Sequence, residues 1–475
     1  MSKLKITDYA IYRWRYWIGY GLIAAILISI LTFTGFFLTG GISEPEMQSV
    51  VISNSINFNN LNSLAIADLP YHTLQHISIM LFGVSVFSIK LPSLILAFIS
   101  IVGAIILLRI WFKPSVSILV ALIAISTGQF LFMSQDGTAN GMCLVWSVSL
   151  LLIASIISRT QRFRKTLIVI FALLAALSLY TPLSAYMLIA FACAILFHPH
   201  LRYLIKQIPN VEIVAGTILS LILITPLAIS IIKNPSLGLS LLGIPTKMPN
   251  LSANITLLGA QYLGFSKPGG STVMTPFFEL GSMLIIALGV YVVAKHHTSA
   301  KSYVIAIWSL MLVPIVIVNP NLAVVTLFPM VLLLAKGLNK FISYWYELFP
   351  LNPYARVGGL IPIIILVSVL VLSGMDRYIY GYRYDPQIVP SFSRDIRIIP
   401  KDTKYLMVSS EEMAFYKVVE IRNKKITVVA TPTGDSFLAT RKIKGQFSGY
   451  NLSKIITTYT KDNGDRFYLY TKAVQ

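Results

Sequence analysis

Up to about residue 375, the chain alternates long apolar stretches with short polar segments. Eleven stretches come near the ~20 residues that a helix needs to cross a bilayer. Pro182 breaks the helical hydrogen-bond ladder between two of them, so we count these two separately. The predicted spans are 16–39, 86–110, 115–133, 142–158, 166–179, 183–197, 211–232, 277–294, 302–318, 321–337 and 358–374. This pattern predicts a polytopic α-helical membrane protein.

Three polar segments between these spans stand out, and we place all three on the outer side of the membrane. Segment 40–85 ends in the semi-apolar stretch His72–Phe82, which is too short to span and is expected to lie in the membrane interface. Segment 134–141 is a tight turn between spans. Segment 233–276 is a long loop rich in Gly and Pro, and long loops are often functional.

The composition changes abruptly after residue 375, where seventeen Lys and Arg accompany ten Asp and Glu. We therefore predict a membrane module over 1–375 and a small soluble α/β domain over 376–475. The domain's predicted elements are strands at 404–409 and 425–431, a helix at 411–421, and a hairpin of strands 455–460 and 466–471 around Asp462-Asn463-Gly464-Asp465.

Composition and charge agree with a membrane protein. The chain is 56% hydrophobic and only 12% charged, whereas soluble domains carry about 25% charged residues. With the N-terminus in the cytoplasm, seventeen Lys and Arg fall in inner segments and four in outer ones, which is the positive-inside pattern. We therefore expect a multi-pass protein of the plasma membrane with an extracytoplasmic C-terminal domain. No basic stripe stands on a soluble face, so the net charge of +20 does not indicate nucleic-acid binding.

Acidic residues are rare in the membrane module, which contains eight of the eighteen. Four of these eight lie in the predicted outer segments: Glu44, Glu46, Asp68 and Asp136. A carboxylate beside lipid is costly unless it has a partner or a task. This group of acids at one membrane face therefore indicates a site.

The first two acids have different interpretations. Ser43 and Glu46 have the spacing of a capping box, in which each side chain accepts a hydrogen bond from the other residue's backbone, so Glu46 is expected to cap a helix. Glu44 has no such structural role and no cation within five residues on either side. We therefore predict a functional Glu44.

Asp136 and Asp68 each have a structural alternative. Asp136 precedes a glycine and suits a turn, while Asn140, four residues on, is able to hydrogen-bond a sugar. Asp68 precedes Leu69-Pro70, where shaping the bend is the alternative to a role in substrate binding.

Histidines and lysines of the outer segments are candidates for binding a lipid phosphate. His72 and His76 share one face of a helix, a spacing that also permits a metal, although no acid or cysteine completes a set. Lys90, Lys247 and Lys267 can meet a phosphate as point charges, and snorkelling to the interface is their alternative role.

Four pieces of the sequence match the layout of one known family. They are the outer segment beginning Ser43-Glu44, the helix entry Leu69-Pro70-Tyr71-His72, the stretch Leu81–Ser93 containing Lys90-Leu91-Pro92-Ser93, and the turn Ser134–Asn140. Together they resemble the GT-C membrane glycosyltransferases, specifically the protein-mannosyltransferase and aminoarabinose-transferase-like group. The resemblance covers about residues 16–240, and the tail does not share it. In that family an aspartate, expected to be the catalytic base, stands where this chain has Ser43, and the acid of the later turn aligns with Asn140.

The resemblance implies a polyprenyl-phosphate-linked sugar as donor and a lipid, glycan or protein as acceptor, with inversion at the anomeric carbon. Such a reaction needs a carboxylate as general base and positive charge at the leaving phosphate. We assign the base to Glu44, with Glu46 as the alternative and Asp136 orienting acceptor or sugar. Tyr71, His72, Lys247 and Lys267 complete the expected substrate contacts, and a divalent cation is left open as a cofactor.

Two other function classes are weighed against an enzyme. A transporter or flippase for lipid-linked sugars would need paired charges or broken helices near the membrane midplane, and the predicted spans contain almost no ionisable residue. A non-catalytic lipid-binding envelope protein is suggested by Ser43, which replaces the family's acid.

Overall fold

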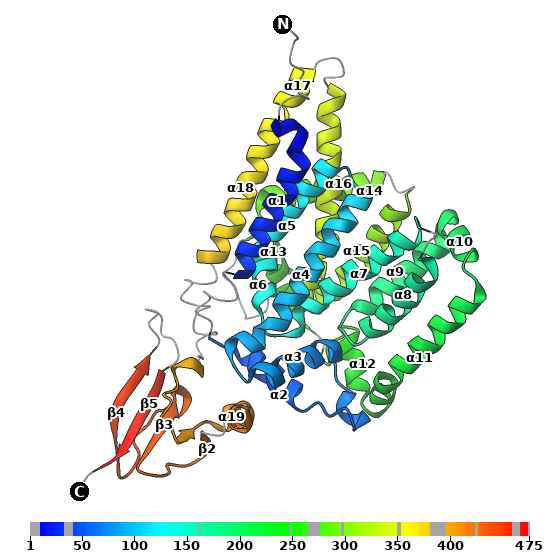
Figure 1. The fold of residues 1–475 in the computed structure, drawn as a ribbon. Coiled ribbons are helices and arrows are strands. Elements are labelled where there is room, and N and C mark those ends of the chain that lie inside the picture. The colour runs from blue at the N-terminus through cyan, green and yellow to red at the C-terminus, as the bar shows by residue number, and fades with distance from the viewer. Residues whose placement is uncertain are drawn as a thin grey trace.

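The protein consists of a helical bundle and a separate five-stranded sheet (Figure 1). The computed structural model describes residues 10–32, 41–160, 163–247, 249–264, 276–295, 299–348, 353–380, 396–422, 426–457 and 466–473. The helices are α1 (Ala10–Thr32), α2 (Glu44–Asn54), α3 (Leu69–Phe82), α4 (Val86–Trp111), α5 (Pro114–Ser126), α6 (Gly128–Gln135), α7 (Met142–Ile157), α8 (Arg164–Ser178), α9 (Ser184–Phe197), α10 (Pro199–Lys206), α11 (Asn210–Lys233), α12 (Pro235–Leu241), α13 (Leu251–Leu263), α14 (Leu280–Lys295), α15 (Ala300–Val318), α16 (Leu327–Leu348), α17 (Pro353–Gly358), α18 (Leu360–Tyr378) and α19 (Ser410–Arg422).

Each of the eleven predicted spans overlaps a helix of the bundle. Among the described residues, six helices are long and apolar enough to cross a membrane, or up to eight if each bent helix pair forms one span. Helices α8 and α14 have 15 and 16 residues, which is short of the ~20 that a bilayer requires. Eleven crossings therefore stay a prediction. The predicted break at Pro182 is confirmed, because α8 ends at Ser178 and α9 begins at Ser184.

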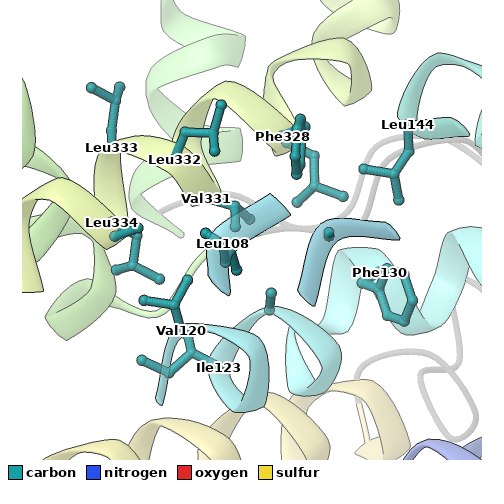
Figure 2. Close-up of a cluster of buried hydrophobic side chains, with 14 of the residues drawn as sticks. Leu108, Val120, Ile123, Phe130, Leu144, Phe328, Val331, Leu332, Leu333 and Leu334 are labelled. Atoms are coloured by element: carbon teal, nitrogen blue, oxygen red, sulfur yellow. The ribbon is translucent and has the colours of Figure 1, made fainter. Parts of the chain in front are cut away.

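The bundle core consists of aliphatic and aromatic side chains, and Figure 2 shows the part contributed by α4, α5, α6, α7 and α16. Helices α1, α9, α14, α15 and α18 contribute further buried residues to the same core. Helices α14 and α16 also pack closely, and glycines make this possible. A Cβ atom at Gly289 would collide with the carbonyl oxygen of Leu333, and one at Gly337 with that of Ile285. Small residues are typical where membrane helices approach backbone to backbone.

Two short helices, α2 and α3, lie across one end of the bundle, on the side of the sheet (Figure 1). The stretch His72–Phe82 falls in the helix α3, and its position in the membrane interface stays a prediction. The segment 233–276, predicted to be a long loop, instead contains the helices α12 and α13, and residues 265–275 lie outside the described residues. Local apolar runs such as Leu237–Leu242 and Leu257–Leu258 supply the packing faces that make these parts helical.

The C-terminal domain contains the strands β1 (Tyr405–Met407), β2 (Thr427–Val429), β3 (Ser436–Thr440), β4 (Tyr450–Thr457) and β5 (Arg466–Lys472) in the order β2-β1-β3-β5-β4. Strand β1 is parallel to β2 and β3, whereas β5 is antiparallel to β3 and β4. The predicted helix is confirmed, and the predicted strands 455–460 and 466–471 overlap β4 and β5, which pair in antiparallel orientation. The turn predicted at Asp462–Asp465 lies outside the described residues. The prediction missed β3, in which four of five residues are buried, so polar and apolar positions do not alternate.

The C-terminal domain and α2 share one hydrophobic cluster. Ile42, Met47 and Val50 from the α2 region pack with Phe415 and Val419 of α19. Helix α2 therefore lies between the bundle and the C-terminal domain, and both fix its rotation about its own axis.

Candidate functional site

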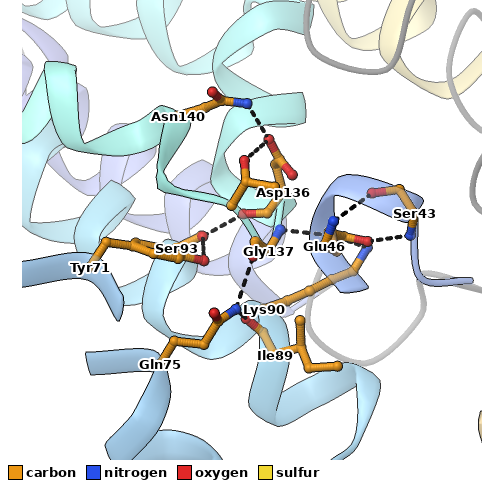
Figure 3. A network of polar contacts seen from close by, with 11 residues as sticks. Ser43, Glu46, Tyr71, Gln75, Ile89, Lys90, Ser93, Asp136, Gly137 and Asn140 are labelled. Atoms are coloured by element: carbon orange, nitrogen blue, oxygen red, sulfur yellow. Dashed lines mark hydrogen bonds and ion pairs between the residues drawn. The ribbon is translucent and has the colours of Figure 1, made fainter. Parts of the chain in front are cut away.

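The site is built on the first turn of α2. Ser43 is the N-cap, and its Oγ accepts a hydrogen bond from the backbone N–H of Glu46 at 3.3 Å. The Oε2 atom of Glu46 accepts a hydrogen bond from the Ser43 N–H at 2.7 Å (Figure 3). The predicted capping box is thus confirmed.

Glu46 has a second set of contacts that no local pattern indicates. Its Oε1 atom accepts a hydrogen bond from the Gly137 N–H at 2.7 Å and lies 3.4 Å from the Nζ of Lys90, near the start of α4 (Figure 3). The exposed fractions of Glu46 and Lys90 are 0% and 4%. A buried ion pair is tolerated when hydrogen bonds satisfy the remaining lone pairs, as they do here.

Asp136 follows α6 and lies on the other side of Gly137. Its Oδ2 atom accepts hydrogen bonds from Thr138 Oγ1 at 2.6 Å and from Asn140 Nδ2 at 2.7 Å. Burial raises the pKa of Asp136 to about 7, the charge of Glu46 adds to this effect, and the two hydrogen bonds and Lys90 oppose it. Asp136 is therefore a carboxyl group that can gain or lose a proton near neutral pH.

Buried polar side chains hold the turn that contains Asp136 and Gly137. Gln75 of α3 donates from Nε2 to the Gly137 carbonyl oxygen at 2.9 Å, and its Oε1 accepts from Ser49 and Ser53 of α2. The hydroxyl of Ser93 donates to the Asp136 carbonyl oxygen and lies 3.0 Å from the hydroxyl of Tyr71. Helices α2, α3 and α4 are thereby connected to this one turn.

Glycine at position 137 is required by the crowding around this turn. A Cβ atom there would lie 2.7 Å from Cγ2 of Ile89 and 3.1 Å from Oε1 of Glu46. The absence of a side chain lets the backbone N–H approach the carboxylate of Glu46 directly.

The two histidines of α3 are engaged within the protein. Nδ1 of His72 lies 2.9 Å from Ser53 Oγ, and Nδ1 of His76 lies 2.8 Å from the Ser53 carbonyl oxygen. Burial lowers the pKa of His72 to about 4, so its ring is neutral at physiological pH. Among the described residues, no group of three or more His, Cys, Asp and Glu side chains is arranged to hold a metal ion.

Asp68 precedes α3 in the left-handed conformation, with a φ of 52°. Its N–H donates to the Tyr180 carbonyl oxygen at 2.8 Å, whereas its Oδ1 atom is buried without a hydrogen-bond partner among the described residues. Burial raises the pKa of Asp68 to about 7, and Thr181 opposes this effect. Asp68 is thus a second buried carboxyl group with a raised pKa, and its role in substrate binding stays a prediction.

Comparisons with known proteins agree with this layout. The family described as dolichyl-phosphate-mannose-protein mannosyltransferase matches residues 71–229, which include Lys90 and Asp136 but not Glu46. The apo structure of ArnT from Cupriavidus metallidurans has a TM-score of 0.56 at 11% identity, covering 97% of this chain and 99% of ArnT. ArnT bound to undecaprenyl phosphate has a TM-score of 0.57 at 10% identity, covering 95% and 98%.

A third structure, the Archaeoglobus fulgidus oligosaccharyltransferase tethered to an acceptor peptide, has a TM-score of 0.52 at 14% identity, covering 88% of this chain and 65% of the other. A comparison with curated proteins gives no significant match. The chain has the fold of the GT-C membrane glycosyltransferases. The matched family region includes the turn that contains Asp136 and Gly137.

Helix α2 separates Glu44 and Glu46, which lie two residues apart in the sequence. Residues two apart on a helix point in nearly opposite directions, and Glu46 faces Lys90 while Glu44 is exposed. Glu44 lines a cavity of about 300 Å³ between α2 and the C-terminal domain, together with Glu411 and Lys442. The structure therefore does not bring Glu44 together with Asp136.

The remaining predicted residues are distributed as follows. Ser43, Glu46, Tyr71, Lys90, Asp136 and Asn140 lie in the polar network of Figure 3. Lys247 is exposed in the segment between α12 and α13, and Lys267 lies outside the described residues. Sequence analysis did not assign roles to Gln75, Ser93, Gly137 or Thr138. For Ser93, Gly137 and Thr138 a signal was present, because all three lie in stretches that resemble the family.

Proposed function

We propose that this GT-C protein transfers a sugar from a polyprenyl-phosphate donor to a lipid, glycan or protein acceptor at the outer face of the plasma membrane. The observation that carries the proposal is a buried carboxyl group with a pKa of about 7, Asp136, near a buried ammonium group, Lys90. Both lie at one end of the bundle, beside the short helix α3. The N-terminus would lie in the cytoplasm and the C-terminal domain outside.

Asp136 acts as the general base in this proposal. The acceptor's nucleophile, a hydroxyl or amide group, attacks the anomeric carbon and must lose its proton as the new bond forms. A base is most effective when its pKa lies near the operating pH, and a pKa of about 7 meets this condition. Direct displacement by the acceptor inverts the configuration at the anomeric carbon.

Lys90 stabilises the leaving group. The bond from the anomeric carbon to the phosphate oxygen breaks, and negative charge develops on the polyprenyl phosphate. A fixed positive charge in a site shielded from water stabilises that charge more than it would in bulk water. Glu46 holds the ammonium group of Lys90, so its proposed role is positioning rather than proton transfer. The undecaprenyl phosphate in the ArnT structure supports this donor class.

In this proposal the general base is Asp136 and not Glu44, the residue to which the sequence analysis gave that role. Two facts support the change: Glu44 is exposed toward the C-terminal domain, whereas Asp136 is buried beside Glu46 and Lys90. The two carboxylates therefore form a matched pair for mutagenesis.

The test is a transfer assay in proteoliposomes with a panel of labelled polyprenyl-phosphate sugars and with lipid, glycan and peptide acceptors. Wild-type protein should release polyprenyl phosphate, Asp136→Asn should lower the rate by at least ~100-fold, and Glu44→Gln should retain it. Loss of activity in Glu44→Gln with full activity in Asp136→Asn would reverse the assignment. If folded wild-type protein turned over none of these donors, the proposed reaction would be contradicted.

A further inference from the structure

A second cavity lies at the opposite end of the bundle from Asp136. It has a volume of about 520 Å³ and is bounded by the ends of α4, α7 and α9, the start of α8 and α15, and the short helix α10. Lys90 and Trp111 lie at the two ends of α4, 21 residues apart, which corresponds to about 30 Å along the helix. This cavity is therefore at the other membrane face from the proposed active site.

The walls of this cavity are apolar and its rim is basic. Leu151, Phe171, Leu188 and Phe191 are among the apolar residues that line it. The charged residues that line it are Arg159, Arg164 and Lys301, and no Asp or Glu is among the described residues that do so. A volume between about 300 and 1,000 Å³ is typical of sites that bind small molecules.

The protein uses only part of the hydrogen-bonding capacity of these three cations. Arg159 donates to the Ile110 carbonyl oxygen at 2.6 Å, Arg164 to that of Leu204 at 2.8 Å, and Lys301 to that of Trp111 at 3.2 Å. A guanidinium group has five N–H donors and an ammonium group has three, so one carbonyl each leaves capacity for an anion. The Nε of Arg164 is buried without an acceptor among the described residues.

Helix α10 gives the cavity the geometry of a membrane-interface site. It follows α9 at a bend of 98°, so it runs across the end of the bundle rather than along it. Leu201 and Leu204 of α10 line the cavity, while Arg202 and Lys206 on the same helix are exposed. An amphipathic helix of this kind is typical of the boundary between lipid headgroups and acyl chains.

We infer that this cavity binds an anionic glycerophospholipid of the surrounding membrane, with its phosphate at Arg159, Arg164 and Lys301 and an acyl chain between α7, α8 and α9. Charge complementarity selects an anion, because the described residues that line the cavity include three cations and no acid. The apolar walls select a lipid over a free phosphate. Basic pockets between membrane helices are known to hold anionic headgroups. This inference is independent of the proposed sugar transfer.

The experiment measures lipid binding to the delipidated full-length protein by native mass spectrometry. The probes are phosphatidylglycerol and phosphatidylcholine with identical acyl chains. Phosphatidylglycerol should bind at least ~10-fold more tightly, and Arg164→Gln should remove most of that preference. Arg202→Gln is the matched control, since it removes a nearby charge that does not line the cavity, and it should leave binding unchanged.

A second variant tests the apolar part without changing any charge. Ala154→Phe fills the cavity next to α7 and should weaken the binding of phosphatidylglycerol by ~10-fold or more, even if Arg164→Gln does not fold. Equal binding of the two phospholipids, or equal losses in Arg202→Gln and Arg164→Gln, would refute the inference. Displacement of bound phosphatidylglycerol by undecaprenyl phosphate would show that the occupant is a donor-type lipid instead.

Discussion

Replacing Asp136 with asparagine should stabilise the protein at high pH while removing its proposed activity. The folded protein raises the pKa of this carboxyl group from 3.8 to about 7, chiefly by burial. Between these two pH values the folded state keeps a proton that the unfolded state has released. Stability therefore falls as the pH rises through this window, and the loss is complete above about pH 7.

The magnitude follows from the same two values. The difference between 3.8 and about 7, at 1.36 kcal/mol for each pKa unit, is about 4 kcal/mol. An asparagine side chain carries no charge to desolvate, and its oxygen can still accept hydrogen bonds from Thr138 and Asn140. Asp136→Asn should therefore match the wild type near pH 4 and exceed its free energy of unfolding by up to about 4 kcal/mol at pH 8.

The assay is urea-induced unfolding of the purified protein in mild detergent from pH 4.5 to 8.5, alongside transfer rates at each pH. Asp402→Asn, an exposed position in the C-terminal domain, is the control and should stay within about 0.5 kcal/mol of wild type at every pH. If the difference in unfolding free energy between Asp136→Asn and the wild type did not grow with pH, the reasoning would be refuted. The wild-type transfer rate should rise with pH through about 7, as Asp136 loses its proton.

Three further substitutions test the remaining contacts. Glu46→Gln leaves the buried Lys90 without its carboxylate and should cost about 3–5 kcal/mol in unfolding experiments. It also removes a charge that raises the pKa of Asp136, so the rise of the rate should move to lower pH, and an unchanged profile would argue against this coupling. Gly137→Ala should lower the free energy of unfolding by about 1–3 kcal/mol and remove most of the transfer activity, because its Cβ meets Ile89. Wild-type kinetics in this variant would show that the turn can shift freely. Gly289→Ala should lower the thermal unfolding midpoint, because its Cβ would collide with the α16 backbone. The control Gly259→Ala, where the added Cβ meets open space, should raise the midpoint slightly. Equal effects of the two substitutions would contradict the close packing of α14 and α16.

Short-range patterns in the sequence were enough to predict much of the fold. Apolar runs predict helices because a buried backbone must satisfy its own hydrogen bonds, and every predicted span overlaps a helix. The Ser43–Glu46 capping box and the break at Pro182 are likewise local, since their partners lie within a few residues. The two runs on either side of Asp462–Asp465 predicted strands that pair, and β4 and β5 are antiparallel neighbours in the sheet.

The make-up of the candidate site was decided by tertiary structure. In the sequence Glu44 is the better candidate for a functional acid, because Glu46 has the spacing of a helix cap. The packing of α2 against the bundle and α19 instead turns Glu46 toward Lys90 and leaves Glu44 exposed. The contact from Glu46 to Gly137 joins residues 91 positions apart, and no local pattern reports such a distance. The raised pKa of Asp136 also depends on burial by several helices at once. Sequence periodicity records which face of an element is apolar, but the rotation of one element against another is set by the packing of all its neighbours.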